Sequence, residues 1–580
     1  MRVPRLRTMS WASLGGGLVL LSASVVMAGG QADDPAGGPA VEREAGIPVT
    51  DPLVIEKCGT CHAPDDKGNL SRISWVRTTP EGWAQAIKRM VRLNGASLTP
   101  DESRAIVQSL SASHGLAPEE AQAVMYIPEK RMLDESNIPN DDVRGACASC
   151  HAFGQPLSWR RSKHEWKLLQ DMHVALYSQA DAQYRRPAAG QDGEGAATKK
   201  RTRGEVGLEY IRKTAPLHTP EWAAWTARAR TPRLAGDWLL TASVPGKGRF
   251  VGTMHVEPGK GEAGFVTRTT LRPLDGGAAM TRTGTGLVYG GYAWRGVSKG
   301  GGAAAPDALS ADTREAMWFA PDQSHATGRW FWGEYHEFGY DVKLVRATAA
   351  PVVLAVTPGR VKAGAKGVEF RVVGHSLPTS PAPADIDLGT GVTVRRIVSA
   401  SPTEWVISAD VADTAISGPR DVAVAGTVLQ SAYPVYRRID SMKVTPETGL
   451  ARLGGGKHPK GYQQFEAIGF ENGPDGKPNT ADDIALGPVD VDWSINEFPT
   501  VWYDDDVKFV GKLSPAALFT PAVDGPNPAR RFGRNNYGEV WVTATARSER
   551  DRFGKPLSAR AFLVVTVPSY QRWDQPEVSR

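Results

Sequence analysis

Hydrophobic residues recur at helical spacing in the first part of the chain. Trp83, Ile87 and Met90 are separated by four and then three residues, which places them on one face of a helix. The preceding residues, Thr79-Pro80-Glu81, are typical of a helix start, with an N-cap hydroxyl, a proline at the first position and an acidic first turn. Helical patterns of this kind predict a mainly helical region that extends to about residue 231.

The pattern changes after Thr231-Pro232, where short strands are separated by glycine and proline. Evenly spaced strands in residues 232–349, such as Gly328-Arg329-Trp330-Phe331-Trp332, predict an antiparallel up-and-down barrel whose aromatic side chains fill its interior. Residues 350–435 alternate with period two over a length typical of an immunoglobulin-like sandwich. We expect a second β-sandwich domain of this class over residues 436–580. The predicted fold is therefore helical at the N-terminus and all-β afterwards.

Length and charge limit the function classes. A chain of 580 residues is too long for one hydrophobic core and implies several domains. The formal net charge of +5 arises from side chains of both signs scattered along the sequence, which argues against nucleic acid as a partner. The 62 glycines and 42 prolines fit the many turns of the predicted β domains.

All four cysteines lie in two copies of one motif, Cys58-Gly-Thr-Cys61-His62 and Cys147-Ala-Ser-Cys150-His151. Two thiols at this spacing can each form a thioether with one vinyl group of a haem, and the next histidine then binds the iron. A redox-active thiol pair or half of a zinc site is the alternative, but zinc would need further ligands at close spacing. The motifs predict two covalently attached haem c groups, in a tandem dihaem cytochrome c domain over residues 33–231.

An internal repeat supports two cytochrome modules in tandem. Met90-Val91-Arg92-Leu93 begins seven residues after Trp83, and His173-Val174-Ala175-Leu176 begins seven residues after Trp166. Valine and leucine occupy matching places in the two tetrapeptides. The first residue of each tetrapeptide carries a side chain that can bind iron. The repeat therefore indicates Met90 and His173 as the sixth ligands of the two haem irons.

We expect His62 and Met90 to bind the first iron. A thioether on the helix face of Trp83 can reach an iron that this tryptophan helps to cover, although a methionine in a helix is more often a core residue. His114 is the alternative ligand, at a position near a helix end where histidine more often serves as a C-terminal residue.

We expect His151 and His173 to bind the second iron. Met172 and His164 are the alternatives to His173. Adjacent helical positions point about 100° apart, so Met172 and His173 cannot both face the iron. The register of valine and leucine in the repeat favours His173.

The N-terminus predicts secretion. Arg2, Arg5 and Arg7 precede an apolar run from Leu14 to Val26, and small residues follow at a plausible cleavage site. We therefore expect residues 1–32 to be a cleaved signal peptide and the mature chain to be periplasmic, since bacteria attach haem to such motifs outside the cytoplasm. The sequence contains no other stretch long and apolar enough to span a membrane.

Two acidic segments near the C-terminus predict solvated structure. Asn472–Asp483 has oxygen ligands at short intervals, but their spacing is not that of an EF-hand, so a turn is favoured over a calcium site. The run Asp504-Asp505-Asp506 is expected to be a charged surface.

A secreted chain with two c-type haem modules, a barrel and two sandwich-like domains resembles the large α subunit of quinohaemoprotein amine dehydrogenase. The specific part of the resemblance is the pair of motifs, Cys58 to His62 and Cys147 to His151, together with the repeat of Trp83/Met90 and Trp166/His173. The β domains contribute only their order and size.

This resemblance implies a periplasmic heterotrimer that oxidises primary amines to aldehyde and ammonia. A small subunit would carry the quinone cofactor, cysteine tryptophylquinone, and a β-propeller subunit would complete the assembly. The four cysteines of this chain are all committed to haem, so it cannot build the quinone itself. Its implied role is electron transfer, without catalytic residues of its own, to a soluble acceptor such as a cytochrome c or a blue-copper protein.

Two other functions remain open from the sequence. A stand-alone periplasmic dihaem cytochrome, with β domains that bind a partner, would involve no amine and would be a stable monomer. A dihaem peroxidase would need an iron with an open or displaceable position, and the ligand candidates in both modules argue against it.

Overall fold

The computed structural model describes residues 44–124, 138–189, 201–228, 231–261, 263–302 and 305–568, all of which belong to one compact unit. The signal peptide expected over residues 1–32 lies outside this part. No helix within these ranges is long and apolar enough to cross a membrane.

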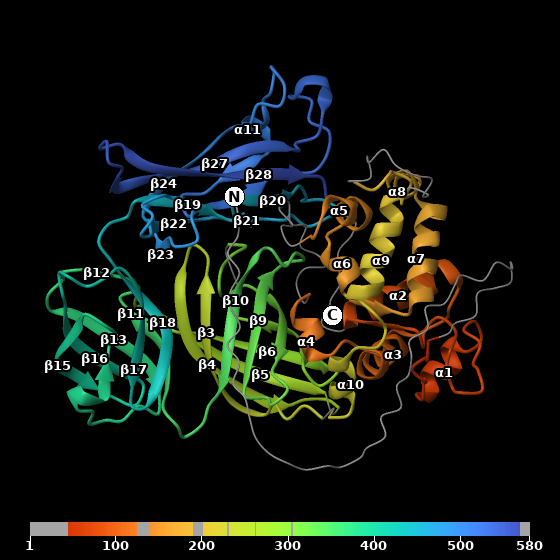
Figure 1. Ribbon diagram of the computed structural model, residues 1–580, viewed down its shortest axis with the longest axis horizontal. Coiled ribbons are helices and arrows are strands. Elements are labelled where there is room, and N and C mark those ends of the chain that lie inside the picture. The colour runs from red at the N-terminus through yellow and green to blue at the C-terminus, as the bar shows by residue number, and fades with distance from the viewer. Residues whose placement is uncertain are drawn as a thin grey trace, which may run out of the picture. The chain divides into compact units, whose positions relative to one another are not determined.

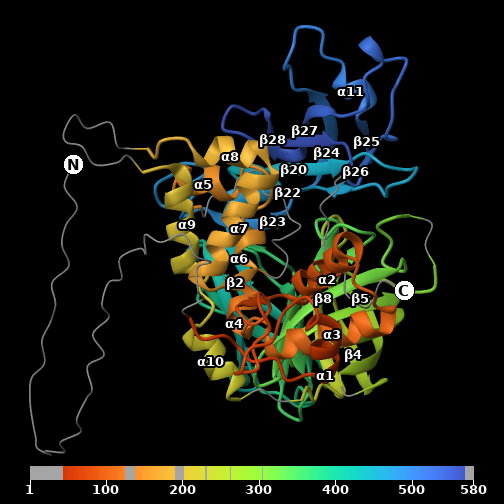
Figure 2. The same ribbon diagram turned by 90° about the vertical axis from the view of Figure 1, so that its right-hand side faces the viewer.

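The described residues before 231 form helices and two short strands, as expected (Figure 1). Figure 2 shows α7, α8 and α9 close together, and these three helices contact one another. In chain order the elements are α1 (Pro52–Cys58), β1 (Val76–Thr78), α2 (Pro80–Asn94), α3 (Pro100–Ser113), α4 (Pro118–Gln122), α5 (Asp141–Cys147), α6 (Gly154–Leu157), β2 (Trp159–Arg161), α7 (Lys163–Leu176), α8 (Ser178–Tyr184), α9 (Arg203–Thr214) and α10 (Pro220–Thr226).

The helices confirm the internal repeat. In the first copy, the indole N–H of Trp83 on α2 donates to the backbone carbonyl of His114, the residue that ends α3, at 3.0 Å. In the second copy, Trp166 on α7 donates in the same way to Ala215, which ends α9, at 2.8 Å. Each tryptophan therefore fixes its own helix against the end of the next long helix in its module.

A two-stranded ladder joins the two copies. β1 pairs with β2 in antiparallel register, and Arg77 lies opposite Arg160. Each arginine stands six residues before the tryptophan of its copy. Both guanidinium groups donate to the carboxylate of Glu120 on α4, Arg77 from Nη1 at 2.8 Å and Arg160 from Nε at 3.1 Å. We call these three residues the Glu120 clamp.

The carboxylate of the Glu120 clamp is ionised despite its burial. Burial by itself would raise the pKa of Glu120, but the hydrogen bonds and charge of Arg77 and the charge of Arg160 lower the pKa to about 2. Two positive groups and one negative group thus meet between the modules, where the side chain of Arg77 is fully buried.

The predicted barrel is confirmed as a closed, eight-stranded, up-and-down barrel, in which each strand pairs antiparallel with the next and β10 pairs with β3. Its interior is filled, because Trp238, Trp294 and Trp330 are all 0 % exposed. A Cβ atom at Gly286 would lie 2.2 Å from the Trp294 ring, so this glycine makes room for the indole. The strands are β3 (Gly236–Val244), β4 (Gly248–Pro258), β5 (Gly264–Pro273), β6 (Met280–Tyr289), β7 (Ala293–Lys299), β8 (Thr313–Phe319), β9 (His325–Trp332) and β10 (Gly339–Arg346).

The outer face of the barrel supports the helical region. Arg295 of β7 forms a buried salt bridge with Glu81 in the first turn of α2. The hydroxyl of Tyr292 donates to the carbonyl of Leu116 at 2.9 Å, and the indole of Trp318 donates to that of Pro118 at 2.8 Å. The barrel therefore holds both ends of the α2–α4 segment that carries the first tryptophan.

The next domain consists of two four-stranded sheets, ordered β11-β13-β16-β15 and β12-β18-β17-β14, that share one hydrophobic core. Trp405 and Phe370 from one sheet and Val422 from the other are 0 % exposed in that core. The elements are β11 (Val352–Thr357), β12 (Val361–Lys362), β13 (Val368–His375), η1 (Pro383–Asp385), β14 (Ile386–Asp387), β15 (Val392–Ala400), β16 (Glu404–Val411), β17 (Gly418–Val424) and β18 (Thr427–Tyr436).

The last domain differs from the expected two-sheet sandwich. A four-stranded sheet, β20-β28-β27-β24, and two three-stranded sheets surround its core. β20 pairs in parallel with β28 although more than a hundred residues separate them, a pairing that alternation along the sequence cannot reveal. The elements are β19 (Ser441–Thr445), β20 (Thr448–Arg452), β21 (Gln463–Gln464), β22 (Glu466–Glu471), β23 (Ile484–Pro488), β24 (Val491–Glu497), α11 (Asp506–Phe509), β25 (Gly511–Leu513), β26 (Leu518–Pro521), η2 (Arg531–Gly533), β27 (Gly538–Arg550) and β28 (Pro556–Thr566).

The expectation that Asp504-Asp505-Asp506 forms a charged surface is wrong for Asp506, and the side chain of Asp504 is also only 3 % exposed. Asp506 is only 4 % exposed. Its carboxylate accepts hydrogen bonds from the fully buried guanidinium of Arg530 and, at 2.9 Å, from the backbone N–H of Glu539. The run was misread because its cationic partner lies 24 residues away in the sequence.

Candidate haem sites

The first cysteine motif begins at the end of α1. Asp51 caps this helix, since its carboxylate accepts hydrogen bonds from the backbone N–H groups of the first turn. Cys58, the last residue of α1, is half-buried against the core cluster that contains Trp83 and Ile87 of α2, whereas Cys61 is exposed. Burial, with the neighbouring Cys61 thiol, raises the pKa of Cys58. One sulfur is thus fixed by the core and the other lies at the surface.

The second motif has the same placement. Cys147 is the last residue of α5 and packs against the buried cluster of Val143 and Phe153, as Val206 and Tyr210 of α9 also do, while Cys150 is exposed. A Cβ atom at Gly207 would lie 2.6 Å from the Cβ atom of Ala146 and 3.6 Å from the Cys147 sulfur, so this glycine makes room for the motif. Burial raises the pKa of the Cys147 thiol to about 12.

The two motif histidines are held in one tautomer. Nδ1 of His62 lies 2.8 Å from the backbone carbonyl oxygen of Ser71, and Nδ1 of His151 lies 3.2 Å from that of Ala152. Because a carbonyl only accepts hydrogen bonds, Nδ1 carries the hydrogen in each ring and the lone pair is on Nε2. Histidine ligands of metals are typically oriented by this kind of bond.

For the sixth ligand of the first iron, the structure weighs against His114. That ring is 0 % exposed, and its nitrogens bond to the Ser113 hydroxyl at 2.8 Å and to the Ile47 carbonyl oxygen at 3.0 Å. Burial lowers the pKa of His114 to about 4, so the ring is a neutral core group. Met90 lies near the C-terminal end of α2 and is half-buried, with its sulfur 3.8 Å from Nδ2 of Asn94.

For the second iron, His173 is half-buried in the last turn of α7, and its Nδ1 lies 2.8 Å from the carbonyl oxygen of Leu169. This bond again leaves the lone pair on Nε2. However, α7 and α9 meet in a hydrophobic cluster of Trp166 and Ile211, whereas Cys147 packs against a separate cluster that contains Val143 and Phe153. The assignments of Met90 and His173 therefore stay predictions.

The residues of both modules fit a haem. Each module offers two thiols and an imidazole in the metal-binding tautomer, and the zinc alternative lacks ligands, since no group of three or more metal-binding side chains includes a cysteine within the described ranges. Large apolar side chains lie exposed on α1, α2 and the end of α7. They are Ile55 at 41 %, Leu93 at 76 %, Leu176 at 65 % and Tyr177 at 55 %.

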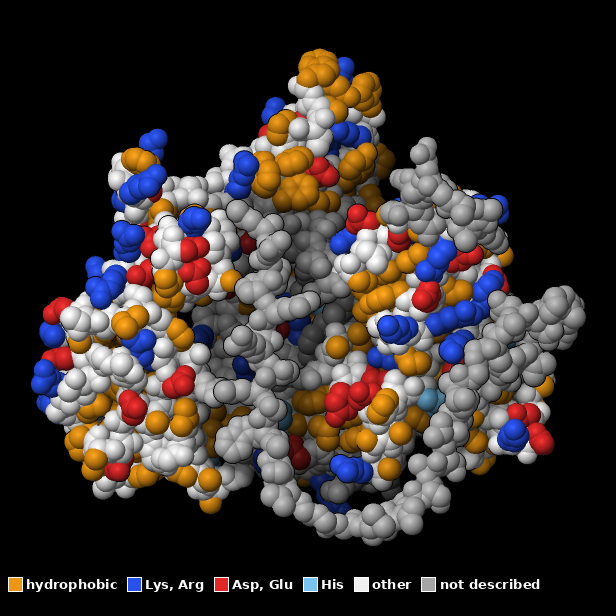
Figure 3. All heavy atoms as spheres, in the orientation of Figure 1, with side chains coloured by type: hydrophobic (Ala, Val, Ile, Leu, Met, Phe, Trp, Pro, Cys, Tyr) orange, Lys and Arg blue, Asp and Glu red, His pale blue; other side chains and the backbone are white. Residues whose placement is uncertain are grey.

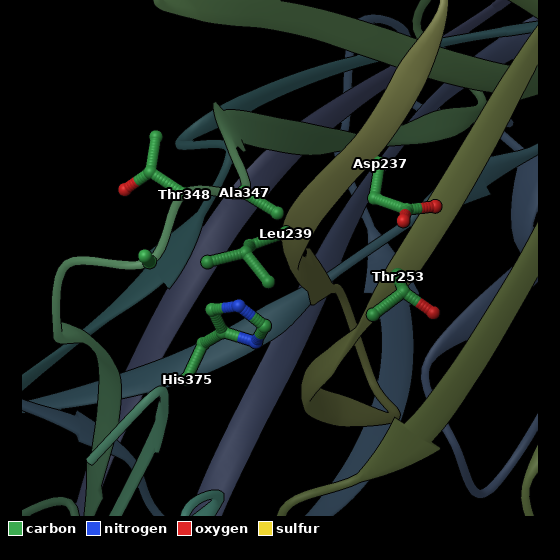
Figure 4. Close-up of a pocket in the computed structure, with 7 residues that line it drawn as sticks. Asp237, Leu239, Thr253, Ala347, Thr348 and His375 are labelled. Carbon is green, nitrogen blue, oxygen red and sulfur yellow. The ribbon is translucent and has the colours of Figure 1, made fainter.

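Two other features of the β domains lie apart from the cysteine motifs. A hollow of about 520 Å³ lies between the barrel and the following domain, with Asp237 and Thr253 on barrel strands and His375 across from them (Figure 4). Asp237 already pairs with His255 at 2.6 Å, and the cysteine motifs are not part of the lining. In the Asn472–Asp483 loop, carboxylate oxygens accept hydrogen bonds from the loop's own backbone, in agreement with a turn.

Four family profiles match the chain and together span most of it. One is described as quinohemoprotein amine dehydrogenase A, alpha subunit, haem binding, and it matches residues 49–195. The other three are domains II, III and IV of the quinohemoprotein amine dehydrogenase alpha subunit, matched at residues 231–347, 350–437 and 442–578. With the two cysteine motifs, these matches define a haem-binding electron-transfer subunit. The chain belongs to the family of quinohemoprotein amine dehydrogenase alpha subunits.

Comparison with solved structures adds no argument. A redesigned β-barrel, mFAP1, bound to DFHBI is 14 % identical over 20 % of this chain and 94 % of its own, with a TM-score of 0.16. Human protocadherin-24 EC1-2 is 12 % identical over 38 % of this chain and 99 % of its own, with a TM-score of 0.15. No curated protein matches the chain.

Proposed function

We propose that this chain is the electron-transfer subunit of a periplasmic quinohaemoprotein amine dehydrogenase. It receives electrons from a cysteine tryptophylquinone in a small partner subunit and passes them through two covalently attached c-type haems to a soluble acceptor. A β-propeller subunit completes the heterotrimer. The observation that carries the proposal is the presence of two Cys-x-x-Cys-His modules, both within the family's haem-binding match at residues 49–195.

In this proposal, bound haem supplies one-electron redox chemistry. Cys58 and Cys61 hold one haem through thioethers, and Cys147 and Cys150 hold the other. His62 and His151 bind the irons through Nε2, because a backbone carbonyl bonds the Nδ1 hydrogen of each ring. The same bond raises the basicity of the imidazole and fixes its plane.

The substrate chemistry is assigned to the partner. Oxidation of a primary amine with water to aldehyde and ammonia releases two protons and two electrons, and two one-electron centres can accept the electrons in succession. All four cysteines of this chain serve haem, so none remains for a quinone cross-link. We therefore assign no catalytic residue to this chain.

Mass spectrometry of the secreted chain tests the attachment. We expect two haem additions and a chain that begins close to residue 33. Replacing Cys58 and Cys61 by alanine should remove one haem, and replacing Cys147 and Cys150 should remove the other, while Ser149→Ala, inside the second motif, should remove neither. A secreted chain without covalent haem would contradict the proposal.

A second experiment tests the complex. Coexpressed with its partner subunits, the chain should copurify with a quinone-bearing small subunit, and a primary amine should reduce its haems. The isolated chain should show no amine-driven reduction. If the chain purifies as a monomer with no quinone-bearing partner, the alternative of a stand-alone periplasmic dihaem cytochrome is supported instead.

A further inference from the structure

Two neighbouring loops of the last domain carry exposed aromatic side chains and an arginine. We call Trp502, Tyr503, Arg531 and Phe532 the tip patch. Trp502 is 88 % exposed and Phe532 is 82 % exposed, among the highest values of any large hydrophobic residue in the described chain. Figure 3 shows hydrophobic side chains gathered, with blue Lys or Arg side chains among them, at the end of the domain where Figure 1 places α11.

Arg531 connects the patch. Its guanidinium lies over three rings, 5.5 Å from the centroid of Trp502, 4.2 Å from that of Tyr503 and 5.0 Å from that of Phe532. Tryptophan, tyrosine and arginine are the residue types that dominate binding energy in protein interfaces. Among the described residues, no carboxylate lies within salt-bridge distance of Arg531, unlike its neighbours Arg530 and Arg534.

Hydrogen bonds and salt bridges of the buried Arg530 join the two loops. The buried guanidinium of Arg530 donates to the backbone carbonyls of Asn535 and Tyr537 at 2.9 and 2.8 Å, and it also binds Asp505 and Asp506. These bonds tie the loop that carries Phe532 to the loop that carries Trp502. The two loops are therefore joined to each other before any partner binds, which reduces the backbone entropy lost on binding.

The backbone of Phe532 is strained. Its φ angle is +64°, in the left-handed region that a bulky residue rarely adopts. Such a conformation persists where the surrounding structure enforces it. Because the side chain is exposed, burial within this chain does not compensate the strain.

We infer that the tip patch is the docking surface for a partner subunit whose facing surface combines an apolar pocket with a carboxylate. The pocket would bury the Trp502 and Phe532 rings, and the carboxylate would pair with Arg531. This inference rests on the proposed function, because it takes the partner from the same multi-subunit complex.

The charges of the two loops favour a protein over a lipid bilayer. Residues 498–506 and 522–537 carry three guanidinium groups, Arg530, Arg531 and Arg534, and four carboxylates, Asp504 to Asp506 and Asp524, so these loops have a net charge of −1. Attraction to an anionic bilayer needs several uncompensated cations. A single guanidinium without a carboxylate partner, held among aromatic rings, can instead bind one carboxylate at a fixed position on a partner protein.

Footprinting of the assembled wild-type complex tests the inference. Hydroxyl-radical oxidation of Trp502 and Phe532 should slow at least fivefold in the complex compared with the isolated haem-loaded chain. Phe553 is the matched control, because it is 73 % exposed in the same domain and lies under an arginine, Arg552, at 4.8 Å. Its oxidation should not change. Equal oxidation of Trp502 in the free chain and the complex would overturn the inference.

Variants supply a second measurement. Trp502→Ala and Arg531→Glu should each weaken subunit association at least tenfold, whereas Phe553→Ala should leave it unchanged, with resistance of the last domain to limited proteolysis confirming that each variant is folded. Wild-type affinity in both tip variants, or binding to phosphatidylglycerol vesicles that Trp502→Ala abolishes, would refute a protein partner at this surface. Amine-driven haem reduction in the wild-type complex is read separately, so a failure of the proposed function is distinguishable from a failure of the docking surface.

Discussion

Replacing Glu120 by glutamine should break the Glu120 clamp without changing its size. The wild-type carboxylate accepts hydrogen bonds from Arg77 at 2.8 and 3.1 Å and from Arg160 at 3.1 Å, and the Glu120 side chain is only 5 % exposed. Removing one partner of a buried ion pair typically costs about 3–5 kcal/mol, because a buried charge is left uncompensated. Since the glutamine oxygen still accepts one hydrogen bond, we expect a loss of about 3 kcal/mol.

Native-state hydrogen exchange is the suitable assay, since a chain with several domains does not unfold in one step. The backbone amides of β1 and β2 should show a free energy of opening lower by the expected amount. Glu119→Gln is the matched control, because Glu119 is exposed on the same short helix, and its effect should stay below about 0.5 kcal/mol. If Glu120→Gln and Glu119→Gln differ by less than 1 kcal/mol, the clamp does not stabilise the junction.

The pH dependence gives an independent check of the clamp. The pKa of Glu120 is lowered to about 2 in the folded chain, from an ordinary value near 4.5. A lowered carboxyl pKa contributes stability that is fully present above the ordinary pKa and is lost as the pH falls through the folded pKa. The difference between wild type and Glu120→Gln should therefore shrink between about pH 4.5 and pH 2.

Trp83→Phe and Trp166→Phe should each lower the local opening free energy by about 1 kcal/mol, because each removes one buried hydrogen bond to a carbonyl that keeps a second donor. Met90→His should lower one haem potential and abolish the near-infrared band of ferric methionine ligation, and His173→Met should raise the other potential; unchanged potentials would reject these ligands. The pKa of His114 is about 4 in the folded chain, below its ordinary 6.5. Between these two values the unfolded chain binds a proton at this residue and the folded chain does not, so the free energy of unfolding decreases as the pH falls from 6.5 towards 4. His114→Gln should flatten the stability profile in that range, as measured by chemical denaturation followed through the haem absorbance.

Features that depend on short stretches of sequence were predictable. The barrel strands each pair with their neighbours in the chain, so alternation and turn residues were sufficient to predict an up-and-down barrel. The cysteine motifs and the cap at Thr79 are likewise local. The spacing also located Trp83 and Trp166 correctly as a repeat, but it did not indicate that their N–H groups hold helix ends.

Features that join distant residues were not predictable. Glu120 meets Arg77 and Arg160 across 43 and 40 residues, and no periodic pattern marks these three positions. The same reason explains the failure at Asp506, whose burial depends on Arg530. Charged residues look alike in the sequence whether they are solvated or paired in a core, and only the tertiary structure separates the two cases.

The opposed positions of Arg77 and Arg160 have a consequence for symmetry. Equivalent residues of two copies face each other, which is the isologous contact that identical chains make about a twofold axis. A polypeptide with one module would therefore carry a strand edge able to pair with its own duplicate. In such a homodimer every residue would occur twice, including a carboxylate for each arginine. In this chain a single carboxylate lies between the two arginines. Because the two copies are covalently linked, their sequences can differ, and the contact around the twofold axis no longer has to be symmetric.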